Sequence, residues 1–135
     1  MALINLLCHD YPDGWALSTA STTLQYVLSL CPPDVRLGAW VKPFASFKPG
    51  VNPAYAWEPV IFHGGRKRTD RTELTVRDWI SASITLQRGL VGAKPLEFNR
   101  WIRDLLGVQS GDELTDLYPG TRGMAVAASE LRLAL

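Results

Sequence analysis

Cysteine and histidine are scarce in this chain of 135 residues, which contains two of each. Cys8 and Cys31 lie in apolar runs and are expected to be buried free thiols. His9 and His63 are far apart in the sequence, and the chain has no Cys-x-x-C motif and no Cys/His cluster with metal-ligand spacing. These absences argue against a metal centre and against a Ser–His or Cys–His catalytic arrangement.

Excess charge and long apolar runs are also missing. The net charge is +1, which gives no bulk attraction to nucleic acid. Residues 1–9 are apolar but too short to span a bilayer, and they carry no charge typical of a signal peptide. No other run approaches the length of a membrane span. We therefore expect a cytoplasmic protein without a membrane partner.

The composition is that of a folded domain. Hydrophobic residues make up 47% of the chain and charged residues 20%, which argues for a globular rather than a disordered protein. Residues 1–135 fit a single small domain. Five tryptophans are many for this length, and we expect most of them in the core.

Apolar spacing and turn residues predict alternating strands and helices. The expected strands are 15–18, 35–41, 57–62 and 113–117, and the expected helices are 24–31, 96–106 and 124–135, after the end of a helix at 3–9. Residues 63–77 are expected to be a polar loop, and residues 78–91 are either a short helix or an extended segment. This alternation predicts an α/β layer structure.

Two motifs frame the expected helix at 96–106. Gly92-Ala93-Lys94-Pro95 precedes it, and Asp116-Leu117-Tyr118-Pro119-Gly120-Thr121-Arg122-Gly123 follows it about twenty residues later. The second motif is a glycine-rich turn between an expected strand and an expected helix. Such a turn presents backbone N–H groups to a nucleotide-like ligand.

This order of motifs resembles the circularly permuted S-adenosylmethionine-dependent DNA methyltransferases, which modify exocyclic amines of adenine or cytosine. Residues 92–123 carry the resemblance most strongly. Residues 40–43 and 58–62 also look like the paired strands that follow the catalytic loop in that family. The resemblance implies a partial Rossmann-like methyltransferase sheet with flanking helices, S-adenosylmethionine as cofactor and DNA as substrate.

Residues matching the family's cofactor-binding motifs are Lys94, Pro95, Asp116, Tyr118, Gly120 and Thr121. Each of the first four also has an ordinary structural interpretation. Lys94-Pro95 is equally a normal helix start, because proline favours the first turn. Asp116 is equally a carboxylate that accepts backbone N–H groups, and Tyr118 is equally a packing residue.

The chain departs from the family's pattern in three places. The catalytic Asp/Asn/Ser-Pro-Pro-aromatic loop is absent, and Cys31-Pro32-Pro33-Asp34 does not match it, so we assign no catalytic residue. Arg122 stands where the second glycine is expected; it either fills the methionine pocket or pairs with the ligand's carboxylate. The acidic residue that binds the ribose hydroxyls has no match. Relative to the family, we expect a domain incomplete at both ends.

The expected loop at 63–77 is the second candidate site. Arg66, Lys67, Arg68 and Arg71 lie within six positions and are expected to contact DNA phosphates. The alternative is a solvated loop, because acidic residues nearby offset part of the charge.

Three functional interpretations remain open. The chain is a methyltransferase domain that is inactive alone, one half of a split enzyme completed by a second chain, or a non-catalytic module that binds nucleic acid or protein. An incomplete sheet leaves exposed edges, which pairing with a second chain or self-association would cover.

Overall fold

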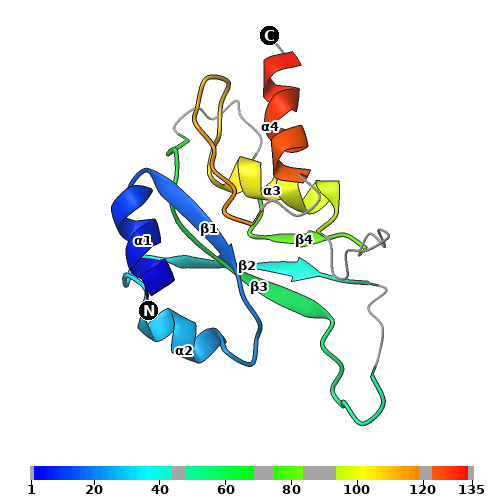
Figure 1. Cartoon of the computed structure of the whole chain (residues 1–135). Helices are drawn as coiled ribbons and strands as arrows, with labels where there is room; N and C mark the ends of the chain where they lie inside the picture. Colours follow the sequence, from blue (N-terminus) through cyan, green and yellow to red (C-terminus); the bar gives the residue numbers. More distant parts are fainter. Residues whose placement is uncertain (1, 44–47, 69–74, 84–93, 119–122, 134–135) are drawn as a thin grey trace.

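The computed structural model describes residues 2–43, 48–68, 75–83, 94–118 and 123–133. The elements in chain order are α1 (Ala2–Asp10), β1 (Gly14–Ser18), α2 (Leu24–Ser29), β2 (Arg36–Val41), β3 (Trp57–Gly64), β4 (Trp79–Ser81), α3 (Leu96–Leu105) and α4 (Gly123–Leu133). The expected α/β class with flanking helices is confirmed (Figure 1).

The strands form one mixed sheet in the order β1-β3-β2-β4. Strand β3 is antiparallel to both β1 and β2, whereas β4 is parallel to β2. Trp40 on β2 lies opposite Glu58 on β3 and opposite Ile80 on β4. The expected pairing of these two strands is therefore confirmed, with a shifted register: of the segments 40–43 and 58–62, only Trp40 and Glu58 lie opposite each other.

Two hydrophobic clusters cover the two faces of the sheet. Residues that are paired across strands point to the same face, and successive residues point to opposite faces. On the face towards α1 and α2, which we call the α1 face, Trp15 and Ile61 pack with Ile4, Leu7 and Val27.

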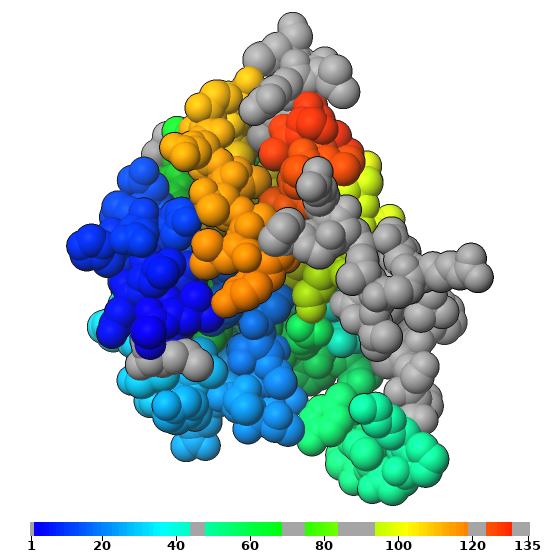
Figure 2. Space-filling model, viewed as in Figure 1, coloured from blue at the N-terminus to red at the C-terminus, as the bar shows by residue number. Residues whose placement is uncertain are grey.

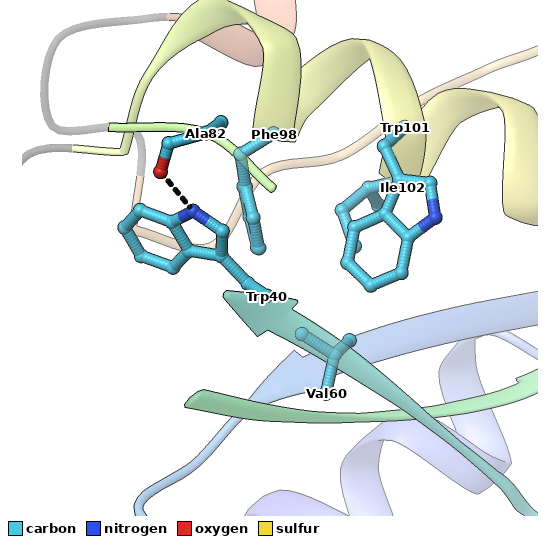
Figure 3. Close-up of a cluster of buried hydrophobic side chains, with 6 residues drawn as sticks. All are labelled: Trp40, Val60, Ala82, Phe98, Trp101 and Ile102. Atoms are coloured by element: carbon cyan, nitrogen blue, oxygen red, sulfur yellow. Dashed lines mark hydrogen bonds between the residues drawn. The ribbon is translucent and has the colours of Figure 1, made fainter. Parts of the chain in front are cut away.

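The opposite face, the α3 face, carries Trp40 and Val60. They pack beneath Phe98, Trp101 and Ile102 of α3 (Figure 3). Helix α4 contacts α3 in turn. Figure 1 shows the resulting order of layers, from α1 and α2 through the sheet to α3 and α4.

Close packing between β2 and α3 depends on Gly38. A Cβ atom placed on Gly38 would lie 2.9 Å from Cη2 of Trp101 and 3.0 Å from the carbonyl oxygen of Asp78. The Trp101 indole Nε1–H donates to the carbonyl of Arg77 at 2.8 Å, and that of Trp40 donates to the carbonyl of Ala82 at 2.9 Å. Trp40 and Trp101 therefore have the partner that a buried tryptophan N–H requires, whereas the buried Nε1 of Trp15, on the α1 face, has no hydrogen-bond partner among the described residues.

Most element predictions are confirmed, with shifted ends. The helix expected at 24–31 ends at Ser29, because the Leu30 N–H already donates to Val27 in a tighter turn before Pro32. Strand β3 continues to Gly64, so the loop expected at 63–77 begins two residues later. Of the segment left open at 78–91, Trp79–Ser81 is extended, and residues 84–91 lie outside the described residues.

The strand predicted at 113–117 is wrong. Residues 113 and 115–117 are exposed, and only Leu114 is half-buried. None of the described strands pairs with this segment, so its backbone groups gain no ladder of hydrogen bonds. Figure 2 shows the segment at the molecular surface, between α1 and α4 in the view.

Three of the five tryptophans are core residues, namely Trp15, Trp40 and Trp101. Trp57 and Trp79 are about half exposed. Cys8 and Cys31 are free thiols and half-buried. Among the described residues, no helix has the length and apolar character needed to cross a membrane.

Candidate cofactor site

Lys94 and Pro95 lie at the start of α3, where the resemblance locates part of a cofactor site. Pro95 is fully buried and has an extended backbone, with ψ at 159°. Its carbonyl accepts the N–H groups of Phe98 and Asn99 and the side-chain amide of Asn99. Pro95 is therefore the N-cap residue of α3, and the first helical residue is Leu96.

The Lys94 side chain reaches back over the sheet. Its Nζ donates to Oε1 of Glu58 at 2.6 Å. The same ammonium lies 4.7 Å from the ring centre of Trp40 and 5.4 Å from that of Phe98. Both distances fall within the range of attractive cation–π contacts, so one carboxylate and two rings fix the position of Lys94.

Lys42 approaches the same groups from the end of β2. Its Nζ lies 2.8 Å from Oε2 of Glu58 and 4.7 Å from the ring centre of Trp40. Lys42, Glu58 and Lys94 thus form a charged triad above Trp40, with 21–29% of each side chain exposed. Two ammonium groups and one carboxylate leave the triad with one excess positive charge.

Burial and charge act in opposite directions on Glu58. Burial raises the pKa of its carboxyl group, but the hydrogen bonds and positive charges of Lys42 and Lys94 outweigh burial and hold that pKa below its ordinary value. Glu58 is therefore ionised at neutral pH and remains an acceptor for both lysines.

Sequence reasoning missed Glu58 and Lys42 as site residues. A signal was available in the strand register, because pairing residues 40–43 with 58–62 brings Trp40 opposite Glu58. Two Lys-Pro pairs, at 42–43 and 94–95, then flank that position.

The beginning of α4 packs against the same aromatic cluster. Met124 contacts the group that contains Trp40, Phe98 and Trp101. Gly123, the last residue of the glycine-rich motif, is the first residue of α4 and directly precedes Met124. Gly120 and Thr121 lie outside the described residues, as does Arg122.

Asp116 and Tyr118 form a local turn before this point. Oδ1 of Asp116 accepts the backbone N–H of Tyr118 at 3.1 Å, which is the geometry of an Asx turn. The Tyr118 side chain is exposed. Asp116 thus makes the backbone contact that we offered as its ordinary structural interpretation.

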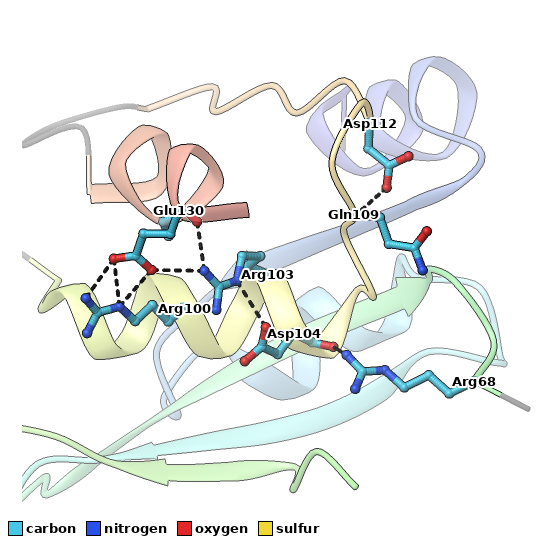
Figure 4. A network of polar contacts seen from close by, with 8 residues as sticks. Arg68, Arg100, Arg103, Asp104, Gln109, Asp112 and Glu130 are labelled. Atoms are coloured by element: carbon cyan, nitrogen blue, oxygen red, sulfur yellow. Dashed lines mark hydrogen bonds and ion pairs between the residues drawn. The ribbon is translucent and has the colours of Figure 1, made fainter. Parts of the chain in front are cut away.

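Two arginines of the predicted DNA-binding loop bond within the protein. Arg66 donates to both carboxylate oxygens of Asp112, at 2.7 and 2.8 Å, and to the carbonyl of Gly107. Arg68 donates to the carbonyl of Asp104 at the end of α3 (Figure 4). Lys67 is exposed, and Arg71 lies outside the described residues. Arg66 and Arg68 therefore attach the loop to the last turn of α3 and to the segment that follows it.

A second charged network joins α3 to α4. Glu130 accepts hydrogen bonds from Arg100 and Arg103, and Arg103 also donates to the carbonyl of Ala127 (Figure 4). These contacts fix the orientation of α4, and with it the position of Met124 over the cluster.

Within the described ranges, no group of three or more histidine, cysteine, aspartate or glutamate side chains is arranged to hold a metal ion. No family model, curated protein or solved structure matches the chain.

Proposed function

We propose that this chain is a methyltransferase-like domain that binds S-adenosylmethionine and belongs functionally to the DNA methyltransferases acting on exocyclic base amines. The partial Rossmann-like sheet of that family is part of the proposal. The cofactor, when bound, supplies an electrophilic methyl group on a sulfonium centre.

One observation carries the proposal. Lys94 and the first turn of α4 lie at the same hydrophobic cluster, because Lys94 lies over Trp40 and Phe98, two of its members, and Met124 packs against the cluster. The two segments that resemble cofactor-binding motifs are about thirty residues apart in the sequence. Their convergence supports a shared ligand.

The chemistry of the triad fits the amino-acid end of the cofactor. That end carries one ammonium and one carboxylate group. Lys94 and Lys42 each use one of their own three N–H donors to bind Glu58. Their remaining donors are available to a carboxylate group, and Glu58 offers an acceptor for an ammonium group. We infer that Lys94, Lys42 and Glu58 hold this end of the cofactor.

Methyl transfer itself requires groups that residues 1–135 do not contain. The Pro-Pro-aromatic loop would accept hydrogen bonds from the target amine and stack on the flipped base. We therefore propose that the chain binds the cofactor but does not methylate DNA alone. A second polypeptide that supplies the loop would complete a split enzyme.

Isothermal titration calorimetry with S-adenosylmethionine and S-adenosylhomocysteine tests the proposal. We expect a micromolar dissociation constant, equivalent to roughly −8 kcal/mol. Lys94→Met should weaken binding at least about tenfold, since about 1.4 kcal/mol corresponds to one charge-assisted hydrogen bond. Lys48→Met, at an exposed lysine in the β2–β3 connection, is the matched control and should bind like the wild type.

Absence of heat with either ligand, in a chain shown by circular dichroism to be folded, would refute cofactor binding. Equal affinities for Lys94→Met and the wild type would instead show that the triad is not part of the cofactor site.

A further inference from the structure

Helix α4 buries little apolar surface against α3. Ala127 is its one buried residue among the side chains that the structure describes, and Val126 is about half exposed. Met124 is half-buried, where it packs against the cluster that contains Trp40 and Phe98. Burial of an alanine removes only a small apolar area from water. The position of α4 therefore depends strongly on its polar contacts.

Glu130 is the centre of these polar contacts (Figure 4). Nε and Nη2 of Arg100 donate to its carboxylate at distances between 2.7 and 3.1 Å. Nη1 of Arg103 donates to Oε2 of Glu130 at 3.0 Å and to the carbonyl of Ala127 at 2.8 Å. The Arg103 side chain is 13% exposed and that of Glu130 is 32% exposed. Paired arginine donors in such a network hold a carboxylate more firmly than an isolated surface ion pair does.

Glu130 carries its charge in the folded chain. The hydrogen bond from Arg100, assisted by that from Arg103, outweighs desolvation and holds the pKa of Glu130 below its ordinary value. Glu130 is therefore ionised at neutral pH. Glutamine has nearly the same shape but no charge, so Glu130→Gln removes the charge–charge attraction without removing the side chain.

The arginine–glutamate network and the proposed cofactor site share α4. Gly123 is both the first residue of α4 and the last residue of the glycine-rich motif, and Glu130 follows it by seven positions. Seven residues correspond to about 10 Å along a helix, so loss of the anchor at Glu130 frees the whole helix to move. Met124 would then leave the cluster on which Lys94 lies.

We propose that Glu130 is a positioning residue for the cofactor site. It docks α4 on α3, so that the first turn of α4 stays at the cluster beneath Lys94, and it does not itself touch the cofactor. This inference rests on the proposed function, which it extends by naming what holds the second motif in place. Only chains with α4 docked bind the cofactor, so the apparent dissociation constant rises by the factor by which the docked fraction falls.

NMR of the Met124 methyl group measures the docked fraction without ligand. The chain has two methionines, and the aromatic rings of the cluster shift the signal of a methyl group packed against them. In Glu130→Gln, the docking equilibrium should weaken about 5- to 10-fold, between the effects of an exposed ion pair and of a charged hydrogen bond. The Met124 signal should move towards the position of an exposed methionine, while the amide signals of β2 and β3 stay unchanged.

Calorimetry with S-adenosylmethionine on the same variants tests the positioning role. The dissociation constant of Glu130→Gln should rise in proportion to the loss of the docked fraction, a correspondence that a purely structural role would not produce. Arg100→Met removes the same contact from the side of α3 and should give the same two changes. Glu113→Gln makes the same substitution at an exposed glutamate outside the network and should match the wild type in both measurements.

Two results would overturn the inference. A wild-type Met124 signal in Glu130→Gln and Arg100→Met would show that α4 stays docked without the network. A shifted signal with wild-type affinity would show that cofactor binding does not require the docked helix. Absence of S-adenosylmethionine binding by the wild type would refute the proposed function and this inference with it, and the methyl signal, which needs no ligand, distinguishes that case from the other two.

Discussion

Replacing Gly38 with alanine should destabilise the protein through one identified steric clash. The added Cβ would lie 2.9 Å from Cη2 and 3.0 Å from Cζ2 of Trp101, and 3.0 Å from the carbonyl oxygen of Asp78. The carbonyl belongs to the backbone beside β4 and accepts the N–H of Ala39 at 2.9 Å. The Trp101 ring is therefore the group that must move.

The magnitude follows from what holds that ring. Overpacking a well-packed core costs about 1–3 kcal/mol. Moving the indole also strains its hydrogen bond to the carbonyl of Arg77, which contributes about 1 kcal/mol. We expect a total loss of about 2–4 kcal/mol in the free energy of unfolding, which corresponds to a fall in Tm of roughly 6–15 °C.

Urea unfolding followed by circular dichroism measures this loss, and a double-mutant cycle tests its cause. Trp101→Phe removes the outer ring atoms that meet the new Cβ. In that background, Gly38→Ala should cost less by at least about 1 kcal/mol. An equal cost in both backgrounds, or a cost below about 0.5 kcal/mol in the wild type, would refute the proposed contact.

Two further predictions concern charged groups. Glu58→Gln should lower the free energy of unfolding at pH 7 by about 1–3 kcal/mol, between the values for exposed and buried ion pairs, because two ammonium groups lose their shared counter-charge. The folded-state pKa of Glu58 is lowered. The stabilisation is therefore present above the ordinary glutamate pKa and is lost as the pH falls through the folded-state pKa. Across that pH range, the urea midpoints of the wild type and of Glu58→Gln should converge. The hydrogen bond from Arg66, followed by that from the Gln109 N–H, holds the pKa of Asp112 below its ordinary value. NMR titration should show this pKa rising in Arg66→Met, and an unchanged value would exclude the pairing.

Local patterns were sufficient to predict most elements of the sheet and its helices. The i, i+3, i+4 spacing around Val27 predicts α2, and the apolar run around Ile61 predicts β3. Such patterns report which side of an element is apolar. They do not report which other element covers that side.

The failures share this non-local cause. Residues 113–117 have strand-like composition, but a strand requires a partner, and in the described sheet none is present there. Trp57 and Trp79 are large apolar residues, but neither belongs to a buried cluster of the described residues, and each is about half exposed. Likewise, Glu58 becomes a site residue only because the register of β2 and β3 brings it opposite Trp40.

Strand β2 contributes to both faces of the sheet. Trp40 points to the α3 face, where its ring lies beneath the ammonium groups of Lys42 and Lys94, whereas Ala39 and Val41 point to the α1 face. A shift of β2 by one residue would exchange these sides, because side chains alternate along a strand. Gly38 resists such a shift, since a residue with a side chain does not fit beneath Trp101. Changes that loosen β2 should therefore lower the free energy of unfolding and weaken cofactor binding together.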